Sequence, residues 1–115
     1  MTARPPRPNI WTANPAVVLD YEIAQEKAST LGRLGRQLEA ALAALRAFDA
    51  SPRELTADTR RERRDLVAEA GYALWLFVVQ REALGLRDQR QVMRDYAVPG
   101  EVQSRMGLLP AKISR

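Results

Sequence analysis

Cysteine and histidine are both absent from this chain of 115 residues. Their absence excludes thiolate nucleophiles, imidazole bases and most zinc sites. Carboxylates, hydroxyls, Lys and Arg are the reactive groups that remain, and they form no catalytic or nucleotide-binding motif. We therefore expect a non-enzymatic protein that uses no metal and no cofactor.

Long apolar runs are also missing. The longest uninterrupted apolar stretch, residues 73–79, is far shorter than the roughly 20 residues that cross a bilayer. Three prolines, Pro5, Pro6 and Pro8, stand where a signal peptide would need apolar residues. Without Cys there is no disulfide framework either. These absences predict a cytoplasmic protein that does not associate with membranes.

Positive charge is only slightly in excess of negative charge. The net charge is +4 and the pI is about 10.1. Many of the basic residues have acidic neighbours at helical spacing. The excess therefore permits an anionic partner without requiring one.

What is present is enough apolar sequence for one folded domain. Hydrophobic residues make up 46% of the chain and charged residues 28%, which is typical of globular proteins. Residues 1–13 contain several Pro and Arg and predict an extended arm. We expect residues 14–107 to form a single helical domain and residues 108–115 a flexible tail.

A long first helix is predicted to begin at Asn14, because Asn caps free amides and Pro15 suits the first turn. It ends near residues 50–52. Small or apolar residues recur along it at alternating spacings of four and three, a pattern typical of a helical-bundle seam. The seam positions are Val17, Tyr21, Ala24, Ala28, Leu31, Gly35, Leu38, Leu42 and Leu45.

A second long helix is predicted from Asp58 to Leu84, with Gly85 ending it. A start at Pro52 is the alternative, because residues 51–54 resemble a capping box. Its seam has the same alternation, at Val67, Ala70, Leu74, Phe77, Arg81 and Leu84.

Two shorter helices complete the predicted fold. Asp88 with Gln91 indicates a helix to about Tyr96, and residues 99–106 form one or two further turns before Gly107. The sequence thus predicts an all-α fold, an antiparallel hairpin of two long helices with one or two short C-terminal helices.

A homodimer is the expected way to complete the bundle. Residues 75–79 are apolar around the whole helix, and one facing helix covers only part of that surface. The candidate core or dimer residues are Trp75, Leu76, Phe77, Val78 and Val79. A compact monomer covered by the third helix and by the arm residues Ile10 and Trp11 is the alternative. Gly32 and Gly35 are interpreted as making room for the ring of Trp75 or Phe77, or for a partner helix.

A polar cluster is predicted around Arg81, which occupies a seam position. A buried guanidinium needs a carboxylate, so we expect Arg81 to pair with Glu22 or Glu26 and to fix the helix register. A small-ligand pocket is the alternative for the whole cluster, which consists of Tyr21, Glu22, Gln25, Glu26, Arg81 and Glu82.

The densest basic cluster lies at the start of the second helix. It is the candidate anion-binding site and consists of Arg60, Arg61, Arg63 and Arg64. Cations there oppose the helix dipole, which makes an anionic partner worth considering. Nearby Asp and Glu residues neutralise part of the charge, so a solvated face is the simpler interpretation.

Three stretches resemble a family of small bacterial proteins known only as a domain of unknown function. They are residues 19–28 with 31–36, residues 79–83 with 85–88, and residues 94–96 with 98–99. The resemblance covers about residues 15–107. It implies a bacterial, cytoplasmic, helical protein and assigns no catalytic residue.

The function is therefore unknown from the sequence, and the leading hypothesis is a non-enzymatic interaction or scaffold protein that acts as a homodimer. The first alternative is a nucleic-acid-associated protein that uses the cluster at residues 60–64. The second is a small-ligand binder with a pocket formed by Tyr21, Glu26 and Arg81.

Overall fold

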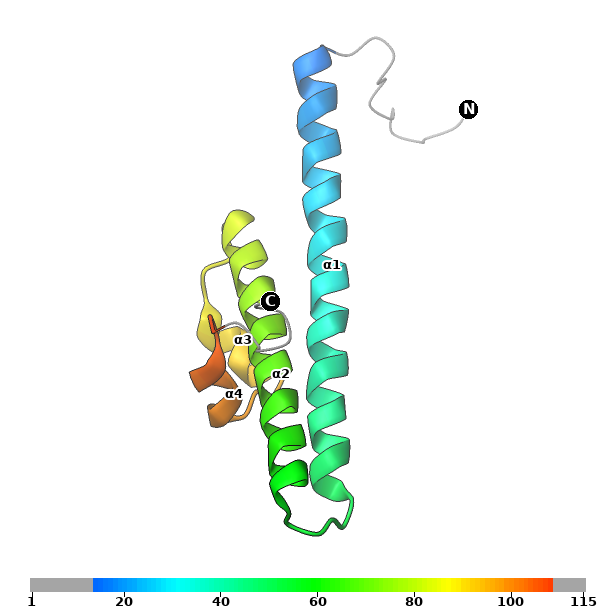
Figure 1. Ribbon diagram of the computed structural model, residues 1–115. Coiled ribbons are helices and arrows are strands. Elements are labelled where there is room, and N and C mark those ends of the chain that lie inside the picture. The colour runs from blue at the N-terminus through cyan, green and yellow to red at the C-terminus, as the bar shows by residue number, and fades with distance from the viewer. Residues whose placement is uncertain (1–13, 109–115) are drawn as a thin grey trace, which may run out of the picture.

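The computed structural model describes residues 14–108, which fold into four helices (Figure 1). They are α1 (Pro15–Ala50), α2 (Ala57–Ala83), α3 (Gln89–Asp95) and α4 (Gly100–Arg105). The described residues contain no strand. The first two helices run antiparallel as a hairpin, and the two short helices pack against α2. The predicted all-α hairpin is confirmed, whereas the predicted arm and all but the first residue of the predicted tail lie outside the described residues.

The helix starts follow from local capping. Asn14 accepts a hydrogen bond from the amide of Ala16 at 2.8 Å, and Pro15 occupies the first turn as expected. At the second helix Thr56 caps the amide of Thr59, while the Thr59 hydroxyl accepts from the Thr56 amide. The alternative start at Pro52 is therefore wrong, because this reciprocal pair fixes the start of α2 at Ala57.

The C-terminal helices are also delimited by local signals. Asp88 accepts from the amide of Gln91 at 3.2 Å, as its spacing predicts. Gly85 and Gly107 have φ values of 83° and 89°, a conformation that favours glycine. They end the helical segments before them at the predicted places.

The core lies between the second half of α1, α2 and the two short helices. Leu38, Leu42 and Leu74 are at most 1% exposed. Val92 of α3 and Val102 of α4 are buried in the same cluster. Burying a side chain of this size stabilises the fold by about 1.5–3 kcal/mol.

Two glycines mark places where elements approach closely. A Cβ on Gly35 would lie 3.2 Å from the Phe77 ring and from the Tyr96 hydroxyl. This confirms the predicted role of Gly35 toward Phe77, and Trp75 plays no part in it. A Cβ on Gly71 would lie 2.7 Å from the Cβ of Arg105, so α4 packs directly on the α2 backbone.

The N-terminal part of α1 projects beyond α2, which reaches it only as far as Lys27 in the described part of the chain. Figure 1 shows α1 projecting well past the end of α2. The hydrogen bond between the two helices that lies furthest from their connecting loop is donated by the side-chain amide of Gln80 to the backbone carbonyl of Lys27, at 3.3 Å. We call residues 15–28 the overhang, because every side chain in it except that of the half-buried Val18 is exposed.

Candidate functional site

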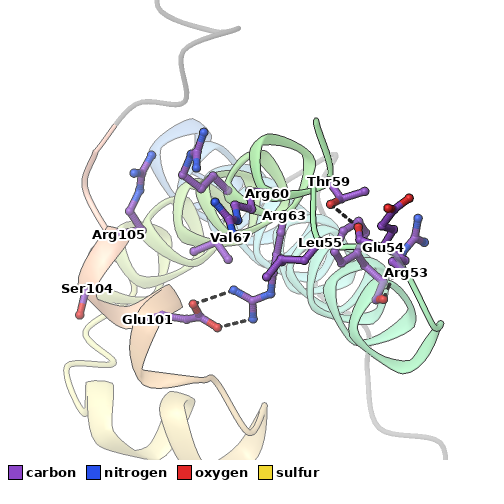
Figure 2. A pocket seen from close by; sticks show the side chains of 12 residues that line it. Arg53, Glu54, Leu55, Thr59, Arg60, Arg63, Val67, Glu101, Ser104 and Arg105 are labelled. Atoms are coloured by element: carbon purple, nitrogen blue, oxygen red, sulfur yellow. Dashed lines mark hydrogen bonds and ion pairs between the residues drawn. The ribbon is translucent and has the colours of Figure 1, made fainter. Parts of the chain in front are cut away.

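A pocket of about 550 Å³ lies at the closed end of the hairpin, where the loop between α1 and α2 meets α4. We call it the arginine pocket (Figure 2). Five of its lining residues are arginines, two are glutamates and three are apolar. In chain order the lining consists of Phe48, Arg53, Glu54, Leu55, Thr59, Arg60, Arg63, Arg64, Val67, Glu101, Ser104 and Arg105.

Arg63 is held by two carboxylates from different helices. Its Nε and Nη2 donate to Asp49 of α1 at 2.8 and 3.0 Å. Its Nη1 and Nη2 donate to Glu101 of α4 at 2.9 and 2.6 Å, and Figure 2 shows this second pair. Both contacts are bidentate, which is the strong geometry for a guanidinium and a carboxylate. Arg63 therefore joins α1, α2 and α4 at this end of the hairpin.

The ion pairs shift the protonation of their members. The hydrogen bonds from Arg63 hold the pKa of the Asp49 carboxyl below its usual value of 3.8. They likewise lower the pKa of Glu101 from 4.5. The two carboxylates, Glu101 first, raise the pKa of Arg63 above its already high value. All three groups remain charged at neutral pH, so Arg63 is structural rather than available for another anion.

The connecting loop forms a second wall of the pocket. The guanidinium carbon of Arg53 lies 4.0 Å from the centre of the Phe48 ring, and its Nε donates to the Phe48 carbonyl at 3.4 Å. The Thr59 hydroxyl donates to the Glu54 carbonyl at 2.7 Å. These contacts hold the loop against the end of α1 and the start of α2. They leave Leu55 beside the pocket with 73% of its surface exposed.

Besides Arg53, which is stacked on Phe48, three further arginines of the pocket have no carboxylate within 4 Å among residues 14–108. They are Arg60 and Arg64 on α2 and Arg105 on α4. The Nε of Arg105 is buried and lacks a hydrogen-bond partner within the same range. The positive charge of the pocket is therefore only partly compensated by the residues that the structure describes.

The predicted anion-binding cluster is divided by the structure. Arg60, Arg63 and Arg64 line the pocket, because residues three and four apart share a helix face. Arg61 is not in the lining; it is exposed and lies 3.6 Å from Asp58. The cluster thus does not form one continuous basic strip.

Two pocket arginines were not predicted. Arg53 belongs to the loop, and its place depends on its stacking on Phe48, which no spacing rule reveals. Arg105 is brought in by α4 packing on Gly71. A glycine inside an otherwise good helix signals a close neighbour, and Gly71 was the available clue.

The predicted polar cluster does not come together. Its four α1 members, residues 21, 22, 25 and 26, are exposed on the overhang. Arg81 forms no ion pair with Glu22 or Glu26 in the described structure, which corrects that prediction; its guanidinium carbon lies 5.9 Å from the centre of the Phe77 ring. The reason is the rotation of α2 about its own axis. Gln80 is the residue whose side chain reaches α1, and the side chain of Arg81 points about 100° away from it.

The apolar segment 75–79 is divided between the core and the surface. Phe77 and Val78 are buried, and Leu76 is half-buried. Trp75 and Val79 remain 38% and 45% exposed. Trp75 packs on Tyr72 with 6.1 Å between the ring centres. The short helices therefore cover only part of this segment.

A second hollow lies over the contact between α1 and the end of α3. Arg46 lines it and donates to the carbonyls of Tyr96 and Ala97 at 3.0 and 3.4 Å. Burial raises the pKa of the Tyr96 hydroxyl, and the nearby Glu39 adds to that shift. The guanidinium here already has partners, so this hollow is a weaker candidate than the arginine pocket.

Neither a metal centre nor a membrane span is found in residues 14–108. No three carboxylates there stand close enough to hold a metal ion. No helix in that range is both long and apolar enough to cross a bilayer.

Comparison with known families adds a classification. A family model with the description "Family of unknown function (DUF6665)" matches residues 4–114. The chain belongs to this family. No curated protein and no solved structure gives a significant match. Membership confirms the predicted uncharacterised domain, and the function of the chain remains unknown.

Proposed function

We propose that this member of the family is a non-enzymatic helical interaction protein that acts as a homodimer paired through the overhang. One observation carries the proposal. The seam of α1 continues without a break into the overhang, where Val17 and Tyr21 are 59% and 56% exposed. In the second half of α1 the same seam is the centre of the core.

The overhang needs a partner for energetic reasons. Most of the stability of a helix in a protein comes from packing of its apolar face, and the overhang has almost no such packing in the described structure. Its seam exposes apolar surface, and burial of that surface against another helix releases about 25 cal/mol per Å². The regular spacing suits a helix as the partner, since the same spacing already packs against α2.

Size complementarity favours a second copy of the chain. In one antiparallel register, Tyr21 faces Ala24 of the second copy and Val17 faces Ala28 of the second copy. Each layer then combines a large side chain with a small one, which fills the space between the helices. The register is symmetric, as a closed two-fold dimer requires.

Charge complementarity points to the same register. Asp20 and Lys27 each precede a seam residue, so they flank the seam on the same side of the helix. In the register above, Asp20 lies beside Lys27 of the second copy, and the pair occurs twice. Flanking charges of opposite sign select partner and orientation in paired helices.

The class and location of the protein complete the proposal. The absence of Cys and His supports a binding role rather than catalysis, and the absence of Cys also suits a reducing cytoplasm. Nucleic-acid binding through residues 60–64 is less well supported, because Arg63 and Arg61 already pair with carboxylates.

Light scattering at micromolar concentration tests the dimer. The expected mass is twice the chain mass of 12.9 kDa. The double variant Val17→Glu with Tyr21→Glu places two carboxylates in the seam and is expected to be monomeric. Both side chains lie outside the core, so circular dichroism should show that α2 and the core remain folded.

A matched double variant controls for charge. Leu19→Glu with Ile23→Glu adds the same charge to exposed apolar positions of the overhang that lie outside the seam. This variant is expected to stay dimeric. A wild-type mass of 12.9 kDa, a dimeric seam variant, or equal dissociation of both variants would each overturn the proposal.

A further inference from the structure

The arginine pocket combines uncompensated positive charge with an apolar floor. We propose that it binds an amphipathic organic anion, with a carboxylate or phosphate head and a short apolar tail. The head group would contact Arg60 and Arg64, and the tail would lie on the exposed Leu55, next to the buried Phe48 and Val67. This site is independent of the overhang, because the two lie at opposite ends of α1 (Figure 1).

Some arginines of the pocket already have partners within the protein, and others are available to a ligand. Its five arginines and two glutamates give the lining a net charge of +3. Arg63 is occupied by Asp49 and Glu101, and Arg53 is stacked on Phe48. Of the three that remain, Arg105 has a buried Nε, whereas Arg60 and Arg64 are exposed, and within the described residues none of the three has a carboxylate within 4 Å.

The placement of the two available arginines favours an anion between them. They are four residues apart on α2, so they share one face of the helix and repel each other. Arg60 also lies in the first turn of α2, where the helix dipole disfavours a cation. A bound anion reverses both effects. A guanidinium recognises carboxylate and phosphate oxygens with the same paired donors, which is why the head group is defined by charge.

The apolar side of the pocket explains why the ligand needs a tail. Leu55 is the most exposed large hydrophobic residue in the described structure, at 73%. Figure 2 shows Arg60 and Arg63 in the middle of the pocket, with Leu55 on one side and Glu101 on the other. Covering Leu55 with a tail removes apolar surface from water, and an inorganic anion does not supply that gain.

The size of the pocket suits a small molecule rather than a polymer. Its volume of about 550 Å³ is within the usual range for small-molecule sites. A single-stranded nucleic acid would need rings on which bases stack. Phe48 is the one aromatic residue of the described lining, and Arg53 already lies over its ring.

Titration of the full chain with defined probes, followed by backbone amide NMR, tests the site. Octanoate and octyl phosphate supply the two head groups with one tail. Octanol supplies the tail alone, and acetate supplies the head alone. We expect saturable shifts at residues 53–64 with either octyl anion, and at least tenfold weaker binding of octanol and acetate. The tighter of the two octyl anions identifies the head group.

A pair of variants with equal charge locates the binding. Arg60→Gln with Arg64→Gln should weaken octanoate and octyl phosphate binding at least tenfold. Arg33→Gln with Arg36→Gln removes the same charge from exposed positions of α1 outside the pocket and should leave binding unchanged. Both doubles change exposed side chains, so both should fold.

Four results would overturn the inference. Octanol binding as tightly as the octyl anions would show an apolar site without anion recognition. Equal weakening by the two double variants would show general charge attraction. Binding of acetate as tight as that of octanoate would remove the role of the tail. Absence of saturable shifts with both octyl anions would remove the site. None of these results bears on the mass of the dimer, so the two proposals fail separately.

Discussion

The two halves of α1 have the same seam and opposite environments. From Leu38 to Leu45 the seam residues are at most 2% exposed, whereas Val17 and Tyr21 in the overhang are more than half exposed. One continuous helix carries both halves, and the alternation of four and three does not change between them. The difference lies in the neighbour, since α2 is 27 residues long and α1 is 36.

This comparison separates what periodicity predicts from what it leaves open. A repeated apolar face indicates that a helix packs on something along that face. It does not say which element is the partner or where that partner ends. The overhang is therefore a place where the pattern predicts a contact that the described part of one chain does not supply.

The largest expected change in stability comes from comparing a Leu→Ala substitution in the core half of α1 with one in the overhang. Leu38→Ala opens a cavity in the core and should lower the free energy of unfolding by about 2–5 kcal/mol. Leu19→Ala removes the same atoms from a side chain that is 56% exposed, and it should change stability by no more than about 0.5 kcal/mol. Urea denaturation at one fixed protein concentration measures both. Equal losses would show that the two halves are equally packed and would break the comparison.

Most of the fold was predictable because its signals are local. Asn14 with Pro15, Asp88 with Gln91, and the two glycines after the helical segments each act within a few residues. The lengths and seams of the long helices followed from periodicity. The predicted start of α2 at Asp58 differs from the observed start by one residue, but the predicted pattern does not include the Thr56 and Thr59 capping pair.

The candidate site was less predictable because it depends on contacts between distant residues. Arg63 bridges Asp49 and Glu101, which lie 14 and 38 positions away in the sequence. Arg105 enters the pocket only because α4 packs on Gly71. The Arg81 prediction failed for a related reason. The predicted pairing of α1 with α2 places Arg81 at the right height along α1. The side chain that reaches α1 there is that of its neighbour Gln80, because α2 turns by about 100° per residue.

The second prediction compares the change in unfolding free energy when Ala replaces Gly71 of α2 and Gly32 of α1. A Cβ on Gly71 would lie 2.7 Å from the Cβ and 3.0 Å from the backbone carbon of Arg105, so α4 must move. Gly71→Ala should therefore cost about 1–3 kcal/mol of unfolding free energy. Gly32, next to the overhang, has only the flexible end of Arg36 within reach, at 3.4 Å. Gly32→Ala should stabilise the protein by about 0.5–1 kcal/mol through helix propensity.

Thermal or urea unfolding of the two glycine variants gives the sign of each change. Opposite signs would show that α4 packs closely on α2 at Gly71 and that no close neighbour stands at Gly32, next to the overhang. Destabilisation by Gly32→Ala would instead indicate a close neighbour there, such as the helix of a second copy. In that case the loss should grow with protein concentration.

The smallest expected change in stability concerns the C-terminal end of α1, where Asp49 forms an ion pair with Arg63 of α2. Both carboxylates of this network are nearly half exposed, so solvent screens the ion pairs and we expect Arg63→Gln to cost about 1 kcal/mol at neutral pH. Because the folded-state pKa values of Asp49 and Glu101 are lowered, their contribution is present above the ordinary values of 3.8 and 4.5. It is lost as the pH falls through the lowered values.

The difference in stability between the wild type and Arg63→Gln should therefore shrink below about pH 4 and vanish once both carboxylates are protonated. Arg33→Gln, which removes an exposed charge elsewhere on α1, should show no such convergence. Urea denaturation across the acid range measures it. A difference that persists at low pH would mean that Arg63 acts through packing of its stem rather than through its charge, and this end of α1 would then be fastened by apolar contacts, as the middle is.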